Sequence, residues 1–278
     1  MIRARRAASL TGRLLVSLLI LLVYFVPFYW MALTAIKSNG EMLKFPPTFW
    51  TAHPSWDNFA VAFGAFPFWK YLWNSILVSG SIILCQVFTV VPAAYAFARY
   101  RFKGSGVFFG LTLASVMIPP QLVFLPVFLL MNRFGLINRY ASLILPQAAS
   151  AFGIFMLRQT FRQVPEEILE AARMDKASEL SIIARIMIPI AMPTISALSL
   201  ITFIGTWNDY FWPLVLTTNE AVRTLPVGVA SLKLLDGGIS IPYNVVMAGN
   251  LILIVPVLLI YLIAQQRITK AFTYMGEK

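Results

Sequence analysis

Six long stretches of this chain contain no Asp, Glu, Lys or Arg, and they constrain the fold more than any other feature of the sequence. A helix needs about 20 mostly apolar residues to span a bilayer, and the shortest of the six stretches has 18. Strands of a membrane barrel would alternate in polarity, whereas these stretches are continuously apolar. We therefore predict an all-α membrane protein, a single transmembrane domain over residues 1–278, with six transmembrane helices near residues 14–36, 74–98, 106–131, 141–157, 186–208 and 245–264.

The few charged residues predict how these helices are oriented. Only 12% of the residues are charged and the mean hydropathy is +0.77, which excludes a soluble enzyme and a disordered chain. If the N-terminus is inside, 15 of the 22 Lys and Arg residues fall on the inner side. The positive-inside rule then places both termini in the cytoplasm, and the net charge of +11 indicates orientation rather than nucleic-acid binding.

The first apolar run could belong to a cleaved signal peptide or to a retained helix. It has 23 residues, which is longer than the apolar region of about 7–15 residues in a signal peptide. We expect a retained helix.

The sequence lacks the residues that several kinds of functional site require. There is no phosphate-binding G-x-x-x-x-G-K-[ST] loop, so ATP hydrolysis is not expected on this chain. One histidine, His53, and one cysteine, Cys85, cannot build a haem or metal site. Asp209 is the only acid close to a span, which disfavours a proton-coupled carrier and, more weakly, a sodium-coupled one. We predict no catalytic, cofactor-binding or metal-binding residues.

The loop over residues 158–185 gathers five of the eleven acidic residues. Pro165 suits the first position of a helix, and Glu166 and Glu167 would favour the positive end of its dipole. Apolar residues recur at helical spacing on one face, namely Val164, Ile168, Ala171 and Ala172. A helix that rests on lipid headgroups usually carries Lys and Arg on its polar face, so this acidic helix favours docking onto a protein partner over a lipid surface.

The same loop resembles the EAA loop of ABC importer permeases, which reads EAA-x3-G-x9-I-x-L-P. Glu170, Ala171 and Ala172 match its start and residues 186–189 match its end, with Lys176 in place of the glycine and Ile188 in place of the leucine. Further blocks follow in the order of the carbohydrate (maltose-type) permeases, at residues 93–99, 103–104, 118–121, 135–138, 145–146, 152–155, 207–214 and 266–267. The chain most resembles the shorter of the two permease subunits. A left-handed backbone at Lys176 would cost about 1–2 kcal/mol, so the turn is expected either to be reshaped or to continue as helix.

The resemblance implies a type I ABC importer permease fold in the cytoplasmic (inner) membrane of a bacterium or archaeon. It implies a heterodimer with a homologous second permease, two cytoplasmic ATPase subunits that bind ATP and Mg, and an extracytoplasmic solute-binding protein that delivers a sugar-class substrate. The loop helix would insert into a cleft of the ATPase. Glu170 and Ala172 are expected to carry the coupling, and Ala172→Asp would test it.

The resemblance also assigns candidate residues to three sites. ATPase coupling is assigned to Pro165, Glu166, Glu167, Ile168, Glu170, Ala171, Ala172, Asp175 and Lys176. The C-terminal tail could contact the ATPase through Tyr274, Met275 and Gly276. A substrate path or gate could involve Trp207, Asn208, Asp209 and Tyr210, for which anchoring of Trp and Tyr at the membrane interface is the alternative.

The expected function is import of a carbohydrate or related polyol, driven by ATP on partner subunits. Three alternatives stay open. The same machinery could carry an anionic cargo such as glycerol phosphate or a sulfonated sugar. The chain could be an autonomous channel or ion-coupled carrier, or a membrane scaffold for an assembly.

Overall fold

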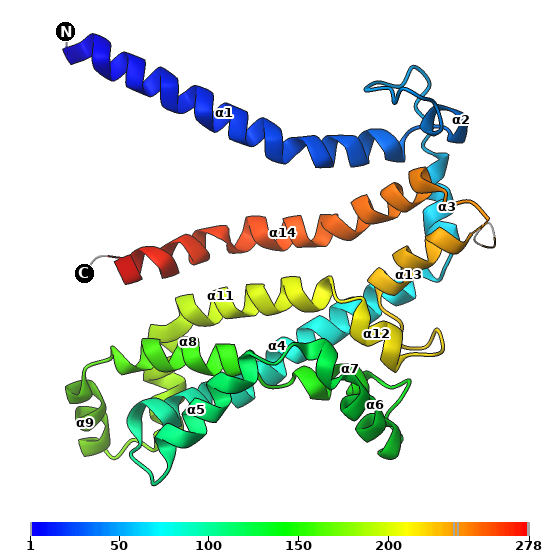
Figure 1. Ribbon diagram of the computed structural model, residues 1–278. Helices are drawn as coiled ribbons and strands as arrows, with labels where there is room; N and C mark the ends of the chain where they lie inside the picture. The colour runs from blue at the N-terminus through cyan, green and yellow to red at the C-terminus, as the bar shows by residue number, and fades with distance from the viewer. Residues whose placement is uncertain (1, 236, 238, 277–278) are drawn as a thin grey trace. The chain divides into compact units, whose positions relative to one another are not determined.

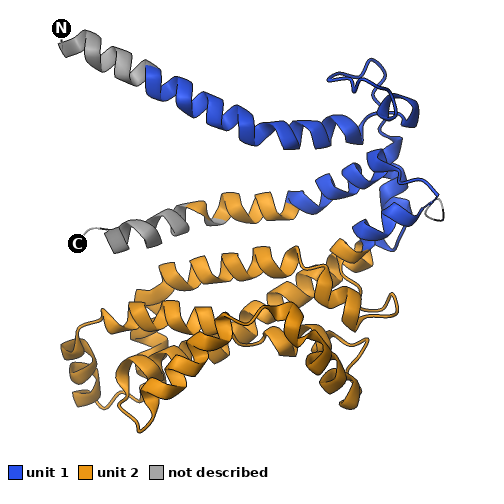
Figure 2. Cartoon of the chain, in the orientation of Figure 1, with its two compact units in different colours: residues 1–68, 228–255 blue, residues 69–227, 256–278 orange. Residues whose placement is uncertain are grey.

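The computed structural model describes the backbone of residues 2–235, 237 and 239–276, and the side chains of residues 12–235, 237, 239–263 and 265. Within these residues every regular element is a helix (Figure 1). The chain divides into two compact units (Figure 2), one of residues 1–68 and 228–255 and the other of residues 69–227 and 256–278.

Four helical runs in the described residues are long and apolar enough to cross a membrane. They are α1 (Ile2–Ala35), α4 (Phe68–Arg99), the run Glu179–Trp207 and α14 (Tyr243–Gly276). The third run joins α10 (Glu179–Ile182), a π-helical turn η3 (Ile183–Met187) and α11 (Ile188–Trp207). Pro189 has no N–H for the carbonyl four residues earlier, which explains a π turn at this place.

The two remaining predicted spans are bent pairs of helices, so the predictions of single helices over 106–131 and 141–157 are wrong in detail. The first pair is α5 (Ser105–Val116) with η1 (Pro120–Val123) and α6 (Phe124–Arg133), bent by 98°. The second is α7 (Tyr140–Ile144) and η2 (Leu145–Gln147) with α8 (Ala151–Arg162), bent by 45°. If each pair forms one span, the total is the predicted six.

Proline and a local cap explain the two breaks. Pro119 is extended (φ −58°, ψ 130°), because the proline that follows it disfavours helical backbone at this position. Ser150 is also extended and its side chain accepts a hydrogen bond from the Gly153 N–H at 3.0 Å, which starts α8 afresh.

The first unit has a polar clamp at the end of α1. The unit also holds α2 (Asn39–Met42), α3 (Asp57–Gly64), the end of α13 (Leu225–Ser231) and η4 (Leu232–Leu234). Asn58 donates to the carbonyls of Ala35 and Lys37 at 2.8 and 2.9 Å, and Asn244 donates to the Asn58 Oδ1 at 2.9 Å. These amides satisfy carbonyls that the end of α1 leaves without an intrahelical partner.

The second unit has two apolar clusters. One joins α4, α8, α11 and α9 (Glu166–Met174), and includes Tyr95, Phe161, Leu169 and Met187. The other joins α4, α6, α7 and α12 (Phe211–Leu216) around Ile82 and Leu143. The first cluster places α9 directly against the membrane-spanning helices of this unit.

Candidate functional site

Helix α9 forms the centre of the predicted coupling loop. Glu166 and Glu167 lie in its first turn and Arg173 in its last, an order that suits the helix dipole. Pro165 is the N-cap, with extended backbone (φ −57°, ψ 140°). The helix therefore begins one residue later than predicted, and Pro165 is not its first residue.

The helix ends at the position where the motif has glycine. Lys176 adopts the left-handed backbone (φ 58°). Its N–H donates to the Arg173 carbonyl and the Ala177 N–H donates to the Ala172 carbonyl, both at 3.0 Å. This is the Schellman pattern that ends many helices at a glycine. The helix does not continue, and Lys176 keeps the glycine-type turn at a cost of about 1–2 kcal/mol.

Only part of the predicted apolar face packs inward, and this part includes the buried Val164. Leu169 is fully buried in the apolar cluster, and Ala172 is partly buried against it. Ile168 and Ala171, which were predicted to share the apolar face, are exposed together with Glu170. The sequence pattern missed Leu169, because its burial depends on packing against other helices, among them α4, which lies much earlier in the chain.

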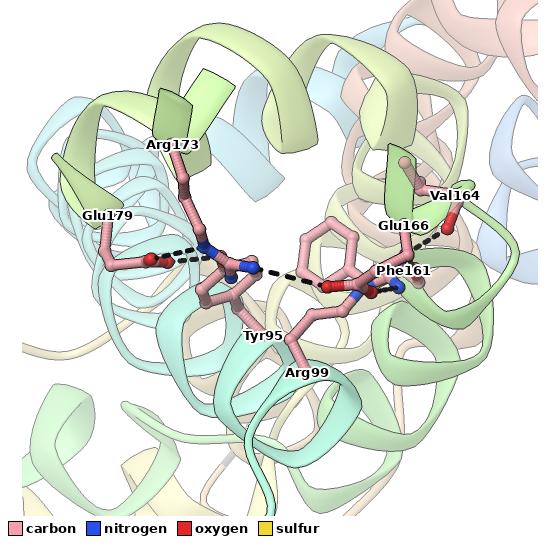
Figure 3. A network of polar contacts seen from close by, with 7 residues as sticks. All are labelled: Tyr95, Arg99, Phe161, Val164, Glu166, Arg173 and Glu179. Carbon is pink, nitrogen blue, oxygen red and sulfur yellow. Dashed lines mark hydrogen bonds and ion pairs between the residues drawn. The ribbon is translucent and has the colours of Figure 1, made fainter. Parts of the chain in front are cut away.

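Arg99, the last residue of α4, fastens the start of α9. Its side chain is only 8% exposed. It donates to the Glu166 carboxylate at 2.8 Å and to the carbonyls of Phe161 and Val164, just beyond the end of α8 (Figure 3). One guanidinium thus caps α8 and holds the first residue of α9, a use of arginine that its forked geometry permits.

A second set of contacts fastens the end of α9. Arg173 donates to Glu179 at 2.9 Å and, with its other arm, to Glu166 at 3.3 Å. Tyr95 of α4, which is buried, donates its hydroxyl to Glu179. The hydrogen bond from Arg173 to Glu179 raises the pKa of Arg173 above its ordinary value. We call Tyr95, Arg99, Glu166, Arg173 and Glu179 the polar relay (Figure 3).

Of the polar relay, only Glu166 was among the predicted coupling residues. Arg99 and Tyr95 are four residues apart, and so on one face of α4, which is the one signal in the sequence that could have nominated them. The relay ties both ends of α9 to the C-terminal end of α4. Polar contacts as well as the packing of Leu169 therefore join α9 to α4 and α8.

The four residues predicted for a substrate path have different surroundings. Trp207 is buried and stacks on Phe203 with ring centroids 5.3 Å apart. Asn208 is exposed and donates to the Ile204 carbonyl, and Tyr210 is 43% exposed. Asp209 accepts hydrogen bonds from the Trp212 N–H at 3.2 Å and from the Gln147 amide at 3.4 Å.

The predicted tail contact lies at the end of α14. The side chains of Tyr274, Met275 and Gly276 are outside the described residues, and their proposed contact stays a prediction. Among the described residues, no group of three or more His, Cys, Asp or Glu is placed to hold a metal ion.

Comparison with known families shows one match over most of the chain. Residues 90–274 match the family described as binding-protein-dependent transport system inner membrane component.

Individual relatives agree with this family. The chain is 33% identical to an arabinooligosaccharides transport system permease protein of Halalkalibacterium halodurans, over 88% of this chain and 86% of that protein. It is 32% identical to a diacetylchitobiose uptake system permease protein of Streptomyces coelicolor, over 95% and 87%. It is 29% identical to an sn-glycerol-3-phosphate transport system permease protein of Yersinia pestis, over 96% of both chains.

The fold also matches a solved structure. A chain of a bacterial ABC transporter involved in the import of the acidic polysaccharide alginate superposes with a TM-score of 0.81. The match covers 95% of this chain and 97% of that one at 24% identity, and it shows a shared fold.

Proposed function

The chain belongs to the family of inner membrane components of binding-protein-dependent transport systems, and on this premise we propose that it is the permease subunit through which an ATP-driven importer moves a carbohydrate or related polyol. Two relatives at 32–33% identity are named for oligosaccharide cargoes, which supports this class. The 29% identical glycerol-3-phosphate relative supports an anionic cargo as the second candidate.

Partner subunits supply the rest of the machinery. A homologous second permease completes the path across the membrane, and a solute-binding protein delivers the cargo from outside. Two cytoplasmic ATPase subunits bind ATP and Mg and drive the cycle. The family description, with its dependence on a binding protein, supports the delivery step.

The outward face of α9 is the docking surface for an ATPase subunit. The observation that carries this proposal is that α9 is secured on its inner side while its outer side remains exposed. Ile168 is 42% exposed and Met174 83%, and Glu170 and Ala171 lie exposed between them. Apolar side chains that surround a small residue allow close approach of another surface, and the acid can pair with basic groups on it.

The coupling step follows from how α9 is anchored. When the ATPase subunits close on ATP, they displace α9 through its outer face. Leu169 and the polar relay transmit this displacement to α4 and α8, because these contacts have one well-packed arrangement and resist sliding. The inward-open path then closes and the outward-open path receives cargo.

Ala171→Asp in the fully assembled importer tests the docking surface. Ala171 is more suitable than Ala172 because Ala172 is partly buried, and a charge there would also disturb the core. We expect Ala171→Asp to reduce co-purification of the ATPase and its cargo-stimulated ATP hydrolysis at least tenfold, while Ala221→Asp, an exposed position on the predicted outer side, changes neither. Unchanged ATPase binding and stimulation in Ala171→Asp would refute docking through this face.

A further inference from the structure

An open cavity of about 520 Å³ is lined by residues of the second unit, where both bent pairs are broken. Ser115 and Pro120 line it from either side of the first break, and Gln147 and Phe152 from either side of the second. Gln86 of α4 adds a further lining side chain. A cavity of this size suits a small ligand, since ligand pockets measure about 300–1,000 Å³.

The breaks explain why polar groups line part of this mostly apolar cavity. Non-helical backbone within a membrane is tolerated only where it is buried in protein or lines a water-filled space. One amide and one hydroxyl satisfy two carbonyls of the second break, and a second hydroxyl holds that amide in place. Gln86 donates to the Gln147 carbonyl at 3.0 Å, Thr89 donates to the Ala148 carbonyl at 2.7 Å, and Thr202 donates to the Gln86 Oε1 at 2.8 Å.

The lining has a definite chemistry. All fourteen lining residues lie in the described part of the chain, and none of them is Asp, Glu, Lys, Arg or His. They present the amides of Gln86 and Gln147, the hydroxyls of Ser115 and Ser150, and the rings of Phe152 and Trp212. Amides and hydroxyls bind sugar hydroxyls, and aromatic rings offer flat apolar faces.

Asp209 is a charged residue directly behind the lining, and its carboxyl group accepts hydrogen bonds from Gln147 and from the backbone of Trp212. A carboxylate behind two lining residues repels an anion in the cavity, and it strengthens Gln147 as an oriented amide. The surroundings therefore favour an uncharged ligand over a phosphate or sulfonate.

We infer that this cavity is a cargo-contact site within this subunit and that it selects uncharged, polyhydroxylated rings. The inference rests on the proposed function as an importer permease. It assigns the cargo contact to the two helix breaks and Phe152, rather than to the exposed part of residues 207–210.

Uptake by the assembled importer in proteoliposomes tests the inference, with arabinotriose, diacetylchitobiose and sn-glycerol-3-phosphate as probes. We expect ATP-driven uptake of at least one of the two uncharged sugars. Phe152→Ala should raise the KM for that sugar about tenfold, and Phe152→Tyr should restore it. Phe88→Ala makes the same truncation at a position of α4 that is 77% exposed and outside the lining, and it should leave the KM unchanged.

A second measurement does not depend on the Phe152 variants. In a Cys85→Ser background, Ser115→Cys places a thiol in the lining, and a small methanethiosulfonate reagent should label it. We expect the transported sugar to slow this labelling several-fold, and sn-glycerol-3-phosphate to leave it unchanged.

Each remaining outcome counts against a specific statement. Uptake of sn-glycerol-3-phosphate alone overturns the inference and leaves the importer function intact. Sugar uptake with an unchanged KM in Phe152→Ala and no protection of Ser115→Cys also overturns the inference. An assembled complex without ATP-driven uptake of any of the three overturns the proposed function itself.

Discussion

At the scale of single residues, Lys176 shows that a helix end can keep its geometry after losing the residue type that favours it. The two Schellman hydrogen bonds and the packing of Ala172 and Ala177 against the apolar cluster hold the turn in place. Their combined stabilisation exceeds the cost of about 1–2 kcal/mol for left-handed backbone at a lysine. The sequence shows that the motif glycine is absent. It does not show whether the surrounding residues reshape the turn, let the helix continue or keep the left-handed turn at Lys176.

Lys176→Gly should therefore stabilise the chain. Glycine removes the left-handed penalty but loses more backbone entropy on folding, about 0.5–1 kcal/mol, so we expect a net gain of about 1 kcal/mol in the free energy of unfolding. Denaturant titration of the assembled complex in mixed micelles measures this gain. Lys176→Ala, which keeps the penalty, should be close to neutral, and an equal gain in both variants would show that the lysine side chain, not the backbone angle, is responsible.

Asp209 gives a pH dependence with a definite sign. Burial raises the pKa of its carboxyl group, and the hydrogen bond from the Trp212 N–H offsets part of this. Between the ordinary and the raised pKa, the folded state binds more protons than the unfolded state, so stability falls as pH rises through that window. Above the raised pKa the penalty is fully present.

Asp209→Asn removes this penalty and keeps an oxygen that can accept from the Trp212 N–H. We expect the variant to gain stability over the wild type as pH rises through the window, with a constant advantage above it. Unfolding midpoints measured from acidic to neutral pH give the comparison. Parallel pH curves for the two proteins would contradict a raised pKa at Asp209.

At the scale of elements, the sequence predicted that α9 exists and where it lies, but of its predicted apolar face only Val164 and Ala172 pack inward, whereas Ile168 is exposed and Leu169 is buried instead. Ile168 and Leu169 are adjacent and equally apolar, so periodicity alone cannot decide between them. The choice is made by Tyr95 and Phe161, which share the apolar cluster with Leu169, and by Arg99, which lies 67 residues before its partner Glu166. Such contacts depend on how the helices pack, which a local pattern does not contain.

Arg99 is predicted to be the residue on which α9 depends most. Arg99→Ala leaves two backbone carbonyls without this donor and removes the shorter of two hydrogen bonds to the Glu166 carboxylate, at a cost of about 1–3 kcal/mol. We expect lower stability and weaker cargo-stimulated ATP hydrolysis in the assembled importer. Arg101→Ala removes an exposed arginine two residues further along and should change neither quantity. Equal effects of the two variants would mean that only net charge matters.

Gly153 lies where α8 packs closely on the side chains of Leu198 and Val90. A Cβ here would lie 2.8 Å from a methyl group of Leu198 and 3.2 Å from one of Val90. We expect Gly153→Ala to destabilise the chain by about 1–3 kcal/mol. Gly110→Ala is the matched control, because its Cβ would meet nothing within 4 Å and a helical alanine should gain about 0.5–1 kcal/mol. Denaturant titration in mixed micelles distinguishes a loss from a gain.

At the scale of the whole molecule, hydropathy predicted the helical class and the number of spans, but not which spans are interrupted. Proline occurs both in the continuous spans and in the interrupted ones. Pro92, Pro193 and Pro256 lie inside single helices, whereas Pro119 and Pro120 lie at a break. Whether a proline bends or breaks a helix depends on the neighbours that re-satisfy the freed carbonyl. The cavity was not predicted for the same reason.

The predicted orientation can be checked directly. In a Cys85→Ser background we expect Met174→Cys, at the exposed end of α9, to react with a membrane-impermeant maleimide only from the cytoplasmic side. Ala221→Cys should react only from the outside. Intact and inverted membrane vesicles separate the two cases, and labelling of both positions from one side would refute the arrangement of spans.

The two helix breaks have a consequence for the energetics of opening and closing. A continuous helix resists bending because its backbone hydrogen bonds must stretch or break. In α5 with α6 and in α7 with α8, those bonds are already missing at the break, and polar side chains satisfy the carbonyls at the second one. The halves that are predicted to lie next to the cytoplasm, α5 and α8, pack on each other, and α8 is joined to α9 through Arg99. Under the proposed function, we expect these halves to act as a stiff lever with compliant pivots, so that the work of ATP closure goes into rotation rather than into deforming helices.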